Sequence, residues 1–132
     1  MKNLEKIIGI FFVIGFLNTI IFIEYLKTTN RSGGEVGMMP IGIMIACGIT
    51  LIFSSLVIGI LKTKKNVSLN SSILIYHIIY FVVILYFGIE LPELTNFSFK
   101  NIDLFIILIA LFVWILAIAI AKLWKKNIAK KD

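Results

Sequence analysis

Charged residues are scarce in this chain, and so are cysteine, histidine and proline. Charged side chains make up 15% of the 132 residues, whereas about 25% is usual in soluble domains. Apolar residues account for 60%, which is more than one core of this size could enclose. We therefore expect the surplus apolar surface to face lipid.

The single cysteine and the single histidine exclude several kinds of site. With Cys47 alone, the chain can form neither an internal disulfide nor the dithiol pair that membrane thiol oxidoreductases need. We expect Cys47 to be an inert packing residue. His77 has no carboxylate close to it in the sequence, so it does not indicate a metal site. No catalytic or nucleotide motif is present, and we predict no enzyme activity, no catalytic residue and no cofactor.

Long apolar runs are what the sequence does contain. Four of them, 19 to 24 residues long, cover residues 7–26, 38–61, 71–89 and 104–124. As helices they would be about 30 Å long, which is the thickness of the hydrocarbon core of a bilayer. A continuous apolar run in lipid must be helical, because its backbone has to satisfy its own hydrogen bonds. The sequence predicts an all-α, integral membrane four-helix bundle that forms one domain over residues 1–132.

Short polar segments separate the four runs and indicate the helix boundaries. Pro40 is expected in the first turn of the second helix, where its missing N–H costs little. Pro92 is expected to end the third helix. Short connections also favour antiparallel neighbouring helices. The candidate N-capping residues are Ser68 or Asn70 for the third helix and Asn101 or Asp103 for the fourth.

The first run follows Lys2 and Lys6, which gives it the basic start of a signal peptide. It is longer than a typical signal-peptide core and no A-x-A site follows it, so we expect it to remain as the first span. Glu24 lies near its other end and is expected to reach water or to pair with Lys27.

Basic residues are divided unevenly between the two sets of loops and ends. The N-terminus, the second loop and the C-terminal segment hold 10 lysines, whereas the first and third loops hold 3 Lys or Arg. Because basic loops stay on the cytoplasmic side, both termini are predicted to be cytoplasmic. Composition rich in Ile, Lys and Asn favours a bacterial plasma membrane. The lysines follow the ends of the spans and do not alternate with aromatic residues, so nucleic acid binding is not predicted.

Polar residues within the spans form a candidate binding seam, which consists of Asn18, Thr50, Ser54, His77 and Tyr80. Antiparallel packing of the second and third helices would place Ser54 at the depth of His77 and Thr50 near Tyr80. Such a seam could relay a proton or bind a small polar ligand. The alternative is that these side chains only form hydrogen bonds that hold the helices together.

The sequence leaves three functions open. The favoured one is a non-catalytic membrane protein that acts through protein–protein interaction, as an accessory or immunity-type factor, with another membrane protein or a second copy as partner. The first alternative is a small oligomeric transporter or channel built around the seam. A lipid-modifying enzyme could use only Ser71, Ser72 and His77, and that group lacks a carboxylate. The acidic and aromatic loop 90–103 is a candidate partner-binding surface.

Overall fold

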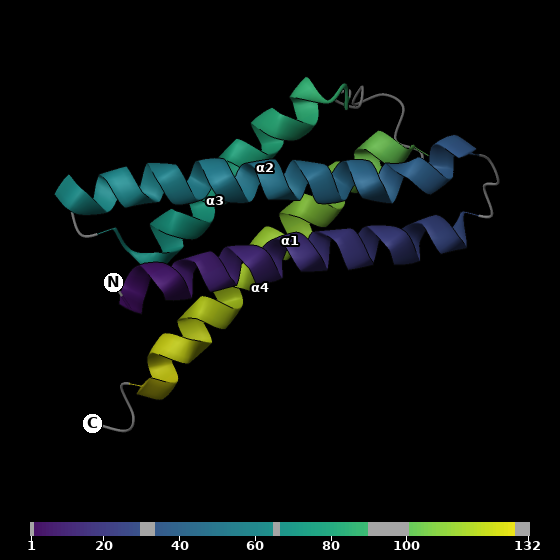
Figure 1. The fold of residues 1–132 in the computed structure, drawn as a ribbon. Coiled ribbons are helices and arrows are strands. Elements are labelled where there is room, and N and C mark those ends of the chain that lie inside the picture. The colour runs from purple at the N-terminus through teal and green to yellow at the C-terminus, as the bar shows by residue number, and fades with distance from the viewer. Residues whose placement is uncertain (1, 30–33, 65–66, 90–100, 129–132) are drawn as a thin grey trace.

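The structure, a computed structural model, consists of four helices and describes residues 2–29, 34–64, 67–89 and 101–128. All four helices are long and apolar enough to cross a membrane. Consecutive helices run in opposite directions (Figure 1). The chain is therefore an integral, multi-pass membrane protein with an all-α bundle, as predicted. The helices are α1 (Lys2–Thr28), α2 (Gly34–Lys64), α3 (Leu69–Tyr86) and α4 (Ile102–Ile128).

The four helices form a closed ring in chain order. Each helix packs against the next, and α4 returns to pack against α1. Across the ring, α1 also contacts α3, whereas the described parts of α2 and α4 do not pack against each other. Figure 1 shows the start of α1, the connection between α2 and α3, and the end of α4 at the same end of the bundle. The two sets of loops and ends therefore separate as the charge pattern requires.

The second helix begins earlier than its apolar run. It starts at Gly34, so Pro40 is its seventh residue and lies inside the helix. The prediction that Pro40 occupies the first turn is therefore wrong. The polar, glycine-containing segment before the apolar run continues the helix by one turn, because nothing in that segment forbids helical backbone angles.

The third helix ends at a glycine rather than at a proline. Gly88 has a φ of 87°, in the left-handed region that glycine adopts without steric cost. The reversal lets the N–H groups of Gly88 and Ile89 bond to the carbonyls of Leu85 (3.1 Å) and Ile84 (3.2 Å), which pairs the last carbonyls of the helix. The prediction that Pro92 ends α3 is therefore wrong, and Pro92 itself lies outside the described residues.

Both predicted N-caps are found, and the structure selects one residue from each pair. Ser68 caps α3, since its hydroxyl accepts a hydrogen bond from the N–H of Ser71 at 3.1 Å. Asn101 caps α4, since its Oδ1 accepts from the N–H of Asp103 (3.1 Å) and lies 3.4 Å from that of Leu104. These bonds satisfy donors that the first turn of a helix leaves unpaired.

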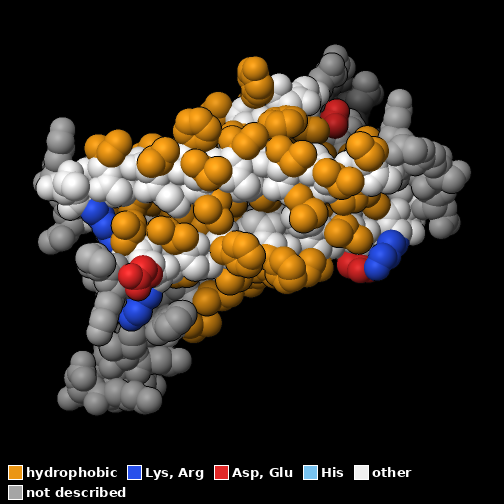
Figure 2. All heavy atoms as spheres, viewed as in Figure 1, with side chains coloured by type: hydrophobic (Ala, Val, Ile, Leu, Met, Phe, Trp, Pro, Cys, Tyr) orange, Lys and Arg blue, Asp and Glu red, His pale blue; other side chains and the backbone are white. Residues whose placement is uncertain are grey.

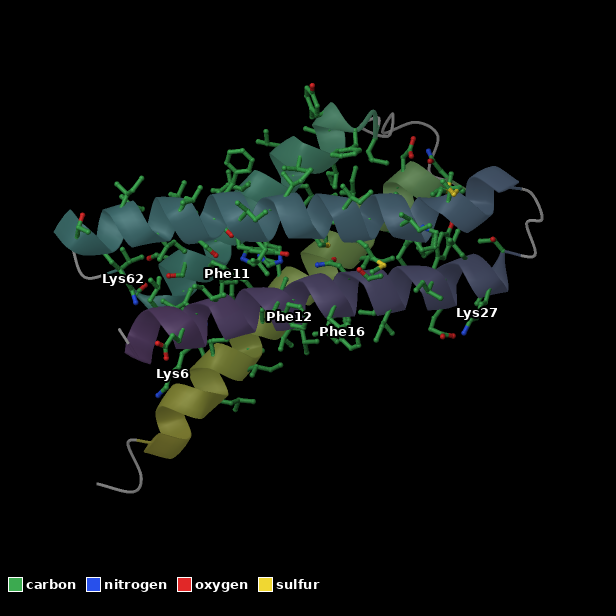
Figure 3. The ribbon with its side chains drawn as sticks, viewed as in Figure 1. Lys6, Phe11, Phe12, Phe16, Lys27 and Lys62 are labelled. Carbon is green, nitrogen blue, oxygen red and sulfur yellow. The ribbon has the colours of Figure 1, made fainter. Side chains whose placement is uncertain are left out.

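The outer surface is apolar along the middle of the bundle and charged at its ends (Figure 2). Figure 3 shows Lys6 and Lys62 at one end and Lys27 at the other, while Phe12 and Phe16 point away from the bundle between them. The predicted pair of Glu24 and Lys27 is present, with Nζ and Oε1 2.6 Å apart. This distribution fits a bundle whose middle contacts lipid and whose ends reach water.

Candidate functional site

The five seam residues all lie inside the bundle. Asn18 on α1, Thr50 and Ser54 on α2, and His77 and Tyr80 on α3 are each no more than 1% exposed. Burying polar groups in a protein surrounded by lipid is costly unless they are hydrogen-bonded. The partners of each group therefore decide whether it only stabilises the bundle or is available to a ligand.

The hydroxyl groups of two seam residues, Thr50 and Ser54, are already paired within their own helix. Thr50 Oγ1 donates to the carbonyl of Ala46 at 2.7 Å, and Ser54 Oγ donates to the carbonyl of Thr50 at 2.6 Å. Thr19 on α1 does the same, with the carbonyl of Gly15 at 3.0 Å. Bonds of this kind need no neighbouring helix. Thr50 and Ser54 therefore have no donor left for a ligand, and the structural interpretation fits them.

A second group of polar atoms is buried without a partner. Within residues 2–29, 34–64, 67–89 and 101–128, five buried side-chain atoms make no hydrogen bond. Two belong to predicted seam residues, and the other three belong to residues that the seam did not include. Buried polar groups are normally paired, so each of these atoms calls for a physical explanation. The five atoms are Asn18 Oδ1, Ser55 Oγ, Tyr76 Oη, His77 Nε2 and Trp114 Nε1.

Three of these atoms belong to neighbouring aromatic rings. The ring centroids of Tyr76 and His77 are 5.5 Å apart in an edge-to-face arrangement, and those of His77 and Trp114 are 6.1 Å apart. Phe11 extends the series onto α1, with its ring centroid 4.9 Å from that of Tyr76. A continuous series of rings therefore connects α1, α3 and α4 through the middle of the bundle.

The tautomer of His77 follows from its one hydrogen bond. Its Nδ1 lies 2.9 Å from the carbonyl oxygen of Ile73, one turn earlier on α3. A carbonyl oxygen can only accept, so Nδ1 carries the proton in the neutral ring and Nε2 presents a lone pair. The backbone bond thus orients the imidazole and leaves an acceptor on its other side.

Cys47 on α2 lies where side chains of α1, α2 and α3 meet. Its thiol is beside the side chains of Thr19, Tyr76 and Tyr80. A Cβ on Gly15 would lie 3.2 Å from both Cys47 Cβ and the Tyr76 hydroxyl oxygen, so any larger residue there would crowd both groups. The sequence predicts Thr50 near the depth of Tyr80, and Cys47, three residues before Thr50 on α2, lies beside Tyr80.

The remaining candidate groups are not brought together. Ser71 and Ser72 each bond to Ser68, through its hydroxyl at 2.8 Å and its carbonyl at 3.0 Å respectively, and neither bonds to His77. In the part of the chain that the structure describes, no group of three metal-ligating side chains is found. Residues 90–100 of the predicted partner-binding loop lie outside the described residues.

Tyr76 and Trp114 are the site residues that the seam omitted. The sequence shows that the N–H of Trp114 needs a partner. No sequence pattern distinguishes Tyr76 from Tyr80, because both lie on α3 and are buried in the core of the bundle. Only the neighbours of each ring reveal which polar atom is unpaired. Comparisons with protein-family models, with curated proteins and with solved structures found no match for this chain.

Proposed function

We propose that the chain is a small, non-catalytic membrane protein that acts by binding another membrane protein, as an accessory or protective factor. The proposal places it in a bacterial plasma membrane with both termini in the cytoplasm, on the basis of the 10 lysines at one set of ends against 3 Lys or Arg at the other. A row of glycines on the outer face of α2 is the observation that carries the proposal.

Gly37, Gly48 and Gly59 follow one another at intervals of eleven residues along α2. Eleven residues correspond to about three helical turns, so the three glycines share one face. A Cβ on any of them would meet no atom within 4 Å, and Gly48 at mid-span is exposed. In contrast to Gly15, these glycines have no packing role within the bundle.

Glycine on a lipid-facing helix surface favours contact with another helix. Lipid chains are as apolar as the helices, so association depends on close packing, and small residues let two backbones approach. The side chains around Gly48 are exposed and apolar, among them Met44, Ile45 and Ile52. The occupant that fits this face is therefore an uncharged, apolar transmembrane helix of a second protein.

Photocrosslinking in native membranes tests this proposal. A photoreactive residue at Ile52 should capture a second membrane protein, and Gly48→Leu should reduce that capture at least tenfold. Gly9→Leu is a matched control, because a Cβ on Gly9 also meets no atom within 4 Å, on α1. Its crosslinking should equal that of the unmodified chain. Crosslinks to lipid alone would refute the proposal, and crosslinks only to a second copy would replace the partner by self-association.

An oligomeric transporter or channel is the second candidate, and the unpaired atoms around His77 favour it. The large buried side chains Phe11, Phe22, Tyr76 and Tyr80 fill the interior of one copy, so a pathway would have to involve several copies. Reconstituted vesicles should then show a flux that His77→Ala abolishes. Absence of flux, or a flux unchanged by this substitution, would refute the second candidate.

A further inference from the structure

We propose that the middle of the bundle contains an internal water site, in which water connects the N–H of Trp114 to the lone pair on His77 Nε2. The site goes beyond partner binding and does not depend on it, because its residues lie in the core and not on the outer face of α2. It also differs from the predicted seam, since Thr50 and Ser54 are paired elsewhere.

The unpaired atoms near His77 need both a donor and an acceptor. Trp114 Nε1 can only donate, and His77 Nε2 in its assigned tautomer can only accept. Both nitrogens are buried and neither makes a hydrogen bond with the residues that the structure describes. Their ring centroids are 6.1 Å apart, so an unpaired donor and an unpaired acceptor belong to neighbouring rings that do not bond to each other directly.

One further atom adds to the demand. The Tyr76 hydroxyl is not counted with it, because that hydroxyl lies beside the Cys47 thiol and the Gly15 backbone. Asn18 donates through Nδ2 to the carbonyl of Ile14 at 3.0 Å, which leaves its Oδ1 as an unpaired acceptor. Asn18 lies seven residues after Phe11, on the face of α1 that contacts Tyr76.

Water is the ligand that matches this set. A buried water molecule offers two donors and two acceptors and is retained where two to four polar groups converge. The three groups, on Asn18, His77 and Trp114, are neutral, so the site has no charge with which to hold a cation or an anion in a medium of low dielectric constant. Unpaired, these atoms would destabilise the bundle, whereas hydrogen bonds to water would satisfy them.

Solid-state NMR of the whole chain in lipid bilayers tests the site, because His77 is the only histidine. Labelling with 15N at His and Trp, with Trp124→Phe included, restricts the ring nitrogen signals to His77 and Trp114, and 13C labelling of Ile and Val supplies the apolar reference signals. Magnetisation from water should reach both rings several times faster than it reaches the side chains of Ile58 and Val113, which are fully buried and apolar. The His77 signals should show a protonated Nδ1 and a bare Nε2.

Trp114→Phe should then reduce the transfer from water to His77 at least twofold, because one partner of the water is lost. Asn18→Leu provides a second variant if the first does not fold. Transfer to both rings as slow as to Ile58 and Val113 would overturn the proposal. A direct coupling between Trp114 Nε1–H and His77 Nε2, or an imidazole protonated on both nitrogens, would overturn it as well.

Discussion

The rings of Tyr25 and Phe105 stack face to face, with centroids 3.8 Å apart and planes inclined by 9°. Tyr25 lies in the last turns of α1 and Phe105 in the first turn of α4. The contact therefore joins helices that are far apart in sequence, at the end of the bundle opposite the N-terminus. It closes the ring of helices where α4 returns to α1.

A double-mutant cycle should measure the coupling between these rings. Tyr25→Leu and Phe105→Leu each remove the stacking, and their combined effect on the free energy of unfolding should be smaller than the sum by about 0.5–1.5 kcal/mol. Reversible unfolding in mixed detergent micelles provides the measurement. Strictly additive effects would show that the two rings contribute only the apolar area that they bury.

Gly15 and Gly9 form a matched pair for testing the close approach of α1. Gly15→Ala places a Cβ 3.2 Å from Cys47 Cβ and from the Tyr76 hydroxyl, and overpacking of this kind should lower the free energy of unfolding by about 1–3 kcal/mol. Gly9→Ala meets nothing within 4 Å and should raise it by up to about 1 kcal/mol, since alanine favours helix. Thermal unfolding of both variants checks the opposite signs. Equal effects would contradict a close approach of the helices at Gly15.

Thr50→Val should be nearly neutral despite the complete burial of the residue. Its hydroxyl bonds only to its own helix, so its removal should cost less than about 1 kcal/mol. Ser54→Ala should behave in the same way. If either substitution changed the water transfer to His77 as strongly as Trp114→Phe, the separation of paired from unpaired seam residues would be wrong.

Labelling of single cysteines tests the orientation. In a Cys47→Ala background, Lys64→Cys and Lys130→Cys should both react with an impermeant maleimide only after the cytoplasmic side is opened, whereas Glu93→Cys should react in intact cells. The unsubstituted chain is the control, because Cys47 is buried and should stay unlabelled in both conditions. Reaction of positions 64 and 130 on opposite sides would refute the four-span topology.

The number and approximate position of the spans could be predicted, because an apolar run of bilayer length leaves the backbone no alternative to helix. Helix ends were less predictable. The first turn of α2 is polar, so apolar content could not find its start at Gly34. At the end of α3, Gly88 competes with Pro92, and the sequence does not show that Gly88 adopts a positive φ.

For the site, burial was predictable and pairing was not. Polar residues within apolar membrane helices face the interior of the bundle, where they can form hydrogen bonds, and this applies to Asn18, Thr50 and His77. Whether a buried side chain bonds to its own helix or stays unpaired depends on its rotamer and on its neighbours. That is why Thr50 proved to be satisfied, while the contact of the Tyr76 ring with Phe11 on α1 is one that no spacing in the sequence reveals.

The missing contact between α2 and α4 has a mechanical consequence. In the described chain, α2 touches only α1 and α3, and α4 touches the same two helices. A push on the outer face of α2 can therefore reach α4 only after displacing α1 or α3. One route runs through α1 and the stack of Tyr25 on Phe105, and the other runs through α3 and the contact of His77 with Trp114, so a force applied at one side of the bundle must pass through an intervening helix to reach the other.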